Sequence, residues 1–148
     1  MPLIDDQGDE FDEWLVFRDL FHGRRAPRNG SQETLLRAWD AIELVHSDGF
    51  ERLIEQPVPL EEYAAALAEV GMLTVVPIVT RVRELLAAAP RRDDDAYRIF
   101  VEDHFDGLKH LAEDFWAQCV NSDEVLLRYV NDHRAEFAEY LSDPTAGA

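Results

Sequence analysis

The chain has one cysteine, one lysine and no long apolar run. Cys119 has no partner for an internal disulfide, which fits a reducing compartment. Apart from Lys109, every basic residue is an arginine, a bias that a GC-rich genome or a salt-adapted cytoplasm also produces. No apolar stretch approaches the roughly 18 residues of a membrane helix, since Pro77 interrupts the longest one. The first residues carry neither a basic segment nor an apolar run, so we expect no signal peptide.

Motifs that fix a chemical reaction are missing as well. The sequence contains no Gly-x-Ser-x-Gly, His-Glu-x-x-His or P-loop pattern. Cys119 falls on an apolar stripe, where a buried and inert thiol is the simpler interpretation. Paired carboxylates for glycoside chemistry could be drawn from 31 acidic residues, and nothing selects a pair. The sequence therefore predicts no catalytic residue and no cofactor.

Negative charge is what the chain has in excess. It carries 31 Asp and Glu against 14 Lys and Arg, a formal net charge of −17 over 148 residues. Such a field repels nucleic acid and attracts basic surfaces. The one basic segment, with Arg24, Arg25 and Arg28, is small and is expected in a surface loop, so we expect no direct nucleic-acid binding. Because 47% of the residues are hydrophobic, the chain can bury a core and is not of the disordered class.

Apolar residues recur with helical spacing from the start of the chain. A first amphipathic helix is predicted over residues 9–22, with Asp9 as its N-cap. A second is predicted to begin at Ser31 as its cap and to end at Gly49, where a left-handed turn is cheap only for glycine. Its inner face would carry Leu35, Trp39, Ile42 and Val45.

Prolines and glycines divide the middle of the chain. One or two turns are expected around residues 50–54, before the next prolines. A helix is then predicted from about Leu60 to Gly71. The following helix would be capped by Thr74 and would tolerate Pro77 in its first turn. Its β-branched residues make a strand the competing interpretation.

The last third predicts further helices after a break at Pro90. Three aspartates at residues 93–95 suit a helix N-terminus. A long apolar stripe runs from Phe105 to Cys119, and a last helix is expected from Ser122 to about residue 141. Four aromatic side chains are assigned to inner faces, with the histidine hydrogen-bonded in the core: Trp14, Trp39, Trp116 and His133.

No strand alternation and no hairpin signal interrupts this pattern. The fold class predicted is all-α, a bundle of six to eight helices with short connections. We expect one acidic domain over residues 1–141 and a flexible tail over residues 142–148.

One segment shows a distinctive order of helix stops. Ser47-Asp48-Gly49-Phe50 follows the acid Glu43, and Val70-Gly71 closes an Ala-rich helix. This order resembles a bacterial all-α family of the DMP nineteen type, which has no known general function and includes an acidic DNA-mimic protein. The match covers residues 35–90 well and residues 95–141 loosely. The resemblance implies an all-α fold, often a dimer, and carboxylates that in at least one member occupy a transcription factor's DNA-binding surface.

Two groups of acids could form such a surface. Duplex DNA carries one negative charge per roughly 1.7 Å of its axis. Carboxylates one turn apart on a helix repeat at about 5.4 Å, so two or three acidic faces can imitate a phosphate ribbon. The alternative is that these acids are solvated faces and helix-terminal charges. The candidate partner-binding residues are Asp5, Asp6, Asp9, Glu10, Asp12 and Glu13 at the start, and Glu102, Asp103, Asp106, Glu113 and Asp114 later.

Several His and carboxylate pairs could hold a metal. Glu43 with His46, and Asp19 with His22, have the i, i+3 spacing found in carboxylate-bridged di-iron bundles. Such pairs arise by chance in an acidic chain and count only once geometry joins them, so no metal ligand is assigned. A further cluster comprises His104, Asp106, His110, Glu113 and Asp114.

These observations predict a non-enzymatic cytoplasmic protein that occupies the basic surface of a DNA-binding protein, either a transcription factor or a nucleoid protein. An immunity or anti-defence protein that inhibits a basic nuclease is an alternative with the same physics. A small metal-dependent enzyme is an alternative of another class. A third is an acidic domain whose charge reflects only salt adaptation or composition. A homodimer is compatible with the prediction, and no membrane partner is expected.

Overall fold

The chain forms a succession of helices with short breaks between them. The computed structural model describes residues 3–4, 10–11, 20–22, 26–54, 58–91 and 94–140. The all-α fold class is thereby confirmed, and the predicted tail at residues 142–148 lies outside the described residues. With η for a 3-10 helix, the elements are β1 (Leu3–Ile4), β2 (Glu10–Phe11), α2 (Gly30–Ser47), η2 (Glu51–Ile54), α3 (Leu60–Glu69), α4 (Val76–Ala87), α5 (Asp95–Ala117), α6 (Ser122–Asp132) and η3 (Arg134–Tyr140).

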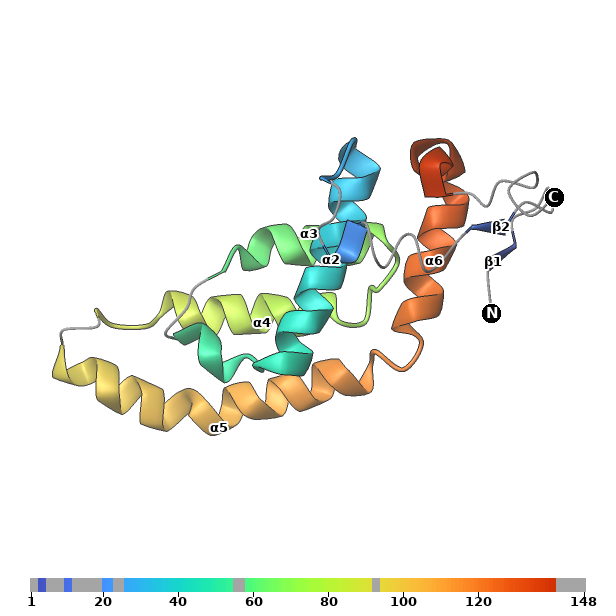
Figure 1. The fold of residues 1–148 in the computed structure, drawn as a ribbon. Coiled ribbons are helices and arrows are strands. Elements are labelled where there is room, and N and C mark those ends of the chain that lie inside the picture. Colours follow the sequence, from blue (N-terminus) through green and yellow to red (C-terminus); the bar gives the residue numbers. More distant parts are fainter. Residues whose placement is uncertain are drawn as a thin grey trace.

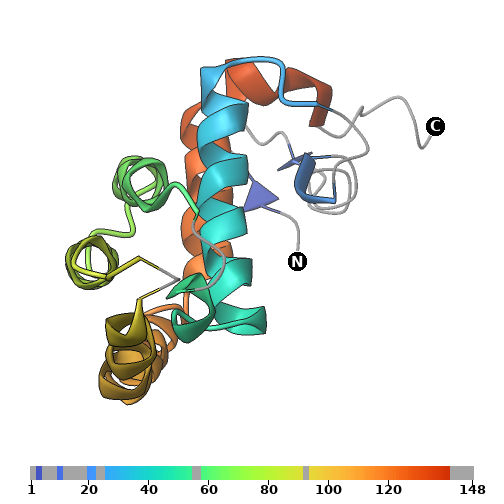
Figure 2. The same ribbon diagram turned by 90° about the vertical axis from the view of Figure 1, so that its left-hand side faces the viewer.

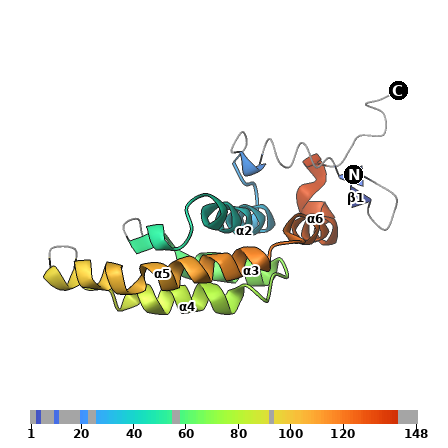
Figure 3. The ribbon, with the colours of Figure 1, turned by 90° about the horizontal axis from the view of Figure 1, so that it is seen from below.

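Two directions of helices build the fold. Helices α3, α4 and α5 lie roughly parallel and alternate in direction, while α2 crosses them (Figures 1 and 3). Helix α6 runs beside α2, and Figure 2 views α3, α4 and α5 almost end-on. Helix α2 contacts α3, α5, α6 and η3, so it is the central element. The core includes Leu35, Ala38, Ile42, Leu67, Val82, Leu108, Phe115 and Val130.

Helix α2 begins two residues earlier than predicted. Asn29 is its N-cap, and the Asn29 side chain accepts a hydrogen bond from the backbone N–H of Gln32 at 2.9 Å. Ser31 lies inside the first turn instead of capping it. The predicted stop at Gly49 is confirmed, because this residue has a φ of 71° directly after the C-cap Asp48.

Helices α3 and α4 confirm the predicted proline and glycine breaks. Helix α3 starts at Leu60, and Gly71 follows its end with a φ of 99°. The segment from residue 76 onward is a helix and not the competing strand, and Pro77 lies in its first turn. The predicted cap Thr74 is wrong, because Val75 occupies the N-cap position and makes no side-chain cap hydrogen bond.

Helix α5 is a single element of 23 residues that starts after the N-cap Asp94, as the run of aspartates predicts. Its apolar stripe is only partly buried. Leu108 and Phe115 are buried, but Phe105 and Trp116 are 44% and 46% exposed, so the assignment of Trp116 to the core is wrong. Within the described ranges, every helix is too short or too polar to span a lipid bilayer.

The last predicted helix is two elements. The α-helix ends at residue 132, and a 3-10 helix follows with non-helical backbone angles at Phe137 (φ −118°, ψ 23°). The break lets Phe137 and Tyr140 both turn into the core. His133 is only partly buried, and its Nδ1 lies 3.0 Å from the Tyr129 carbonyl oxygen, in agreement with a hydrogen-bonded histidine.

The predicted first helix is wrong at its start. Residues 10–11 form a strand that pairs antiparallel with residues 3–4, and β1 lies against α6. Strand pairing between segments this short satisfies backbone groups without a side-chain pattern that periodicity could reveal. Residues 12–19, with Trp14, lie outside the described residues, while Leu20 is fully buried.

A buried glutamine ties the two ends of the described helical core together. Gln32 has no exposed surface, and its Nε2 donates to the Glu136 carbonyl at 2.7 Å and to Glu139 Oε1 at 2.6 Å. Its Oε1 accepts from the Arg28 backbone N–H at 3.0 Å. The first turn of α2 is thus joined to η3. Replacing the amide would remove a hydrogen-bond partner from the Arg28 N–H and from the Glu139 carboxylate.

Gln32→Leu is therefore expected to lower the free energy of unfolding by about 1–3 kcal/mol, because the Arg28 N–H and the Glu139 carboxylate lose this partner, while the Glu136 carbonyl keeps its bond from the Asn29 side chain. The neighbouring exposed residue provides the control, and Glu33→Gln is expected to change stability by less than about 0.5 kcal/mol. Urea denaturation with an unchanged m-value measures both. Equal stability of the two variants would show that the amide contacts contribute nothing.

A matched pair of glycine substitutions tests the turn after α2. Gly49→Ala places a Cβ at positive φ, where a left-handed conformation costs roughly 1–2 kcal/mol, and against the Glu51 carboxylate. Gly107→Ala, in the middle of α5 with no neighbour near the new Cβ, is expected to stabilise by about 0.5–1 kcal/mol. Thermal and urea unfolding should show opposite signs, and equal signs would contradict the assignment.

Candidate functional site

The outer face of α5 gathers all the acids predicted in the second group. Phe100, Leu108 and Phe115 turn inward, so helical geometry directs the polar positions outward. Six carboxylates of the helix are exposed, against Arg98 and Lys109 as its only strong bases. The exposed acids are Asp95, Glu102, Asp103, Asp106, Glu113 and Asp114.

Helical spacing arranges these acids in rows. Asp95, Glu102, Asp106 and Glu113 are separated by seven, four and seven residues, so they share one face; we call them the carboxylate row. The row extends about 27 Å at a rise of about 1.5 Å per residue. Two further acids eleven residues apart, Asp103 and Asp114, form a second line beside it. Helix α5 runs along the lower edge of the molecule in Figure 1.

Few of these charges are compensated. In the described part of the chain, Glu113 is the α5 acid with an ion-pair partner: its Oε2 lies 3.5 Å from His110 Nδ1, a pair that is charged only when the histidine is protonated. Acids elsewhere pair with arginines. These pairs are Arg37–Glu62 at 3.9 Å, Arg81–Glu84 at 3.7 Å, Arg83–Glu61 at 3.4 Å and Arg128–Glu124 at 3.3 Å.

The first group of predicted acids is almost entirely unplaced. Only the backbone of Glu10 is described, as part of β2. The structure thus neither joins this group to α5 nor separates it from α5. The predicted residues that lie outside the described ones are Asp5, Asp6, Asp9, Asp12 and Glu13, together with Asp19, Arg24 and Arg25.

Aromatic rings contact two of the histidines that were considered as metal ligands. His46 stacks on Trp116 with ring centroids 4.5 Å apart, and His104 packs on Phe100 at 4.4 Å. His110 is exposed on the outer face of α5, whereas His104 is partly buried. Among the residues that the structure describes, no three His, Cys, Asp or Glu side chains are grouped to hold a metal ion.

Cys119 is buried directly after the end of α5. Burial raises the pKa of its thiol to about 11, because the thiolate would lose its hydration. At neutral pH the side chain therefore stays protonated and is a poor nucleophile. This agrees with the inert thiol that the sequence indicates.

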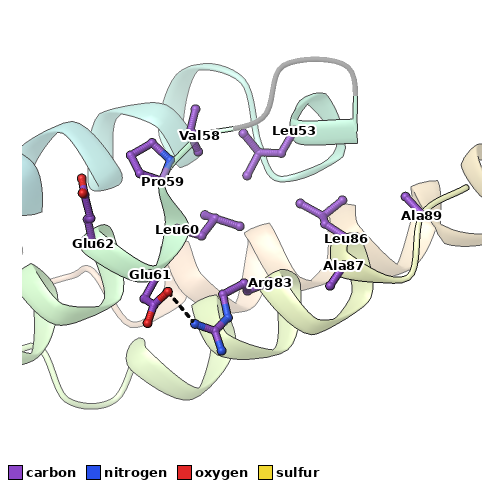
Figure 4. A pocket seen from close by; sticks show the side chains of 10 residues that line it. All are labelled: Leu53, Val58, Pro59, Leu60, Glu61, Glu62, Arg83, Leu86, Ala87 and Ala89. Carbon is purple, nitrogen blue, oxygen red and sulfur yellow. Dashed lines mark ion pairs between the residues drawn. The ribbon is translucent and has the colours of Figure 1, made fainter. Parts of the chain in front are cut away.

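Two surface hollows were not apparent from the sequence. The larger, about 510 Å³, lies between η2, α3 and α4 (Figure 4). Leu53, Leu60 and Leu86 line it, and the Glu61–Arg83 ion pair lies beside it. Its described lining offers no group of reactive side chains, so we assign it no chemistry.

The smaller hollow, about 310 Å³, lies between the C-terminal end of α2 and the second half of α5. We call it the α2–α5 hollow. Trp116 and Lys109 line it beside three acids, Asp48, Glu51 and Glu113. The sequence analysis missed it because the apolar stripe placed Trp116 in the core.

Comparison with known proteins adds one family. No curated protein and no solved structure matches the chain. The family model described as DMP19-like protein matches residues 28–133, which span α2 through α6 and include the whole of α5. That is well over half of the 148 residues, and it agrees with the resemblance carried by the helix stops around Gly49 and Gly71. The chain therefore belongs to the DMP19-like protein family.

Proposed function

We propose that this protein is a non-enzymatic mimic of DNA that occupies the basic surface of a DNA-binding protein. The observation that carries the proposal is the carboxylate row of α5, exposed along about 27 Å with three of its four members free of ion pairs in the described part of the chain. The formal net charge of −17 adds a long-range field of the same sign.

Competition for the same cations is the proposed mechanism. Arginine and lysine side chains that would contact phosphates instead contact carboxylates, which are also anionic hydrogen-bond acceptors. The negative field of the protein accelerates its encounter with a basic partner. Because the same field repels DNA, the partner cannot bind this protein and DNA at the same time. The row is sparser than duplex DNA, which carries one charge per roughly 1.7 Å, so further acidic segments of the chain contribute to the complete surface.

Pairing elsewhere in the fold supports binding over simple salt adaptation. Acids of α3 and α4 are matched with arginines, as in Arg83–Glu61, which weakens the field over those helices. On α5 the single arginine, Arg98, lies near Asp95 and Glu102 but forms no ion pair with them in the described part of the chain. Single unpaired acids such as Glu33 and Glu69 also occur elsewhere, but α5 carries the carboxylate row along one face of a single helix.

A salt-dependent capture experiment tests the partner class. The immobilised protein is expected to retain a DNA-binding protein from the cytosol of its source organism at about 0.1 M salt, and to release it near 1 M, where the Debye length falls from about 10 Å to about 3 Å. Duplex DNA should elute the same protein, because both anions compete for one site. A retained protein that still binds DNA while held on the matrix would contradict the mechanism.

Two triple variants of equal charge test the surface. Glu102→Gln with Asp106→Asn and Asp114→Asn is expected to weaken partner binding about ten-fold or more, as uncompensated contacts are lost. Glu33→Gln with Glu69→Gln and Asp132→Asn removes the same charge from other exposed positions and should change affinity by less than about three-fold. Equal losses in titrations of the purified partner would show that net charge alone matters.

A further inference from the structure

Trp116 is one of three large apolar side chains of α5 that are about half exposed, with Ile99 and Phe105, and of these it is the one that lines the α2–α5 hollow. One face of its indole stacks on the His46 ring, with centroids 4.5 Å apart and an interplanar angle of 6°. The stack fixes the orientation of the indole at the end of α2, while 46% of the residue remains open to solvent. The face of an exposed indole attracts a cation placed over it.

The α2–α5 hollow places carboxylates beside this indole. Asp48, Glu51 and Glu113 line the same hollow of about 310 Å³. Glu51 Oε2 is shielded from solvent, and no described residue donates a hydrogen bond to it. An anionic oxygen without a donor costs free energy and favours an incoming N–H group.

Lys109, the only lysine of the chain, lines this hollow as well. In the described part of the chain it forms no ion pair within 4.0 Å, although three acids surround the same space. Its ammonium lowers the negative potential of the hollow without filling it. The free protein thus holds a weak internal competitor for a cation at this position.

We propose that the α2–α5 hollow binds one arginine side chain of the basic partner, with the guanidinium between Trp116 and the surrounding carboxylates. A guanidinium is planar and weakly hydrated, stacks on aromatic rings and donates several hydrogen bonds to carboxylates, whereas an ammonium is a strongly hydrated point charge. The hollow therefore selects arginine over lysine. As part of a partner interface this inference rests on the proposed function, but the hollow itself can be tested without the partner.

Titration of the purified protein with N-acetylarginine amide tests the hollow, with N-acetyllysine amide as the matched cation. Backbone amide signals of Gly49 and Glu113 in NMR spectra report binding. The arginine compound is expected to saturate with a Kd on the order of 1–10 mM, and the lysine compound to bind at least about five-fold more weakly. Equal affinities would overturn the assignment to arginine.

Variants locate the site. Trp116→Ala should abolish the shifts, whereas Phe105→Ala, which removes another half-exposed aromatic of α5 outside the hollow, should preserve them. Lys109→Gln should tighten binding about three-fold or more, because it removes the internal competitor; Arg98→Gln makes the same charge change outside the hollow and should alter Kd less than about two-fold. Unchanged shifts in Trp116→Ala, or equal effects of Lys109→Gln and Arg98→Gln, would overturn the inference.

The two proposals fail separately. Loss of arginine binding leaves the effects of the triple variants on α5 intact, so the mimic survives without this anchor. If the protein retained in the capture experiment does not bind DNA, the proposal of DNA mimicry fails. Selective binding of the arginine compound would still support the proposed arginine site in the α2–α5 hollow.

Discussion

The rotation of α5 about its own axis is the constraint on which the surface depends. Leu108 and Phe115 have no exposed surface, and the helix packs against α2, η2 and α4. Because burying side chains of this size contributes roughly 1.5–3 kcal/mol each, turning the helix by even one residue would expose them. The same packing therefore holds the carboxylate row toward solvent along the whole helix. The buried apolar residues and the exposed acids belong to one amphipathic pattern, so a rotation of α5 would move both sets together.

Self-repulsion of a chain with a net charge of −17 opposes the compact state. The fold compensates some acids across helices, through Arg37–Glu62 between α2 and α3 and Arg83–Glu61 between α4 and α3. All of these pairs are substantially exposed, so each contributes little to stability. Their larger effect is to offset Glu61 and Glu62 of α3, whereas three of the four acids of the carboxylate row have no ion pair in the described part of the chain. Under the proposed function, an uneven charge distribution of this kind would orient a basic partner during encounter.

Helix boundaries were predictable where single residues determine them. Gly49, Gly71 and Pro77 act through backbone conformation, which no distant contact can easily override, and the structure places each as predicted. Tertiary features were not. The periodicity of the apolar stripe predicted that Trp116 is buried. However, neighbouring helices cover only part of the stripe of this 23-residue helix, and the sequence does not show which part remains exposed. The outward direction of Glu102 and Asp106 followed from spacing alone, whereas the α2–α5 hollow beside Trp116 requires α2 and α5 to meet.

Gly49 links the fold to the proposed arginine site more closely than a helix stop requires. Its positive φ ends α2, and the space where a Cβ would lie is filled by the Glu51 carboxylate. A larger residue would displace that carboxylate from the hollow even if the turn survived. The same position thus sets the direction of the chain and the charge beside Trp116. A phosphate ribbon offers a cation charge but no fixed aromatic face, so this hollow would let a mimic prefer one basic protein among many that bind DNA.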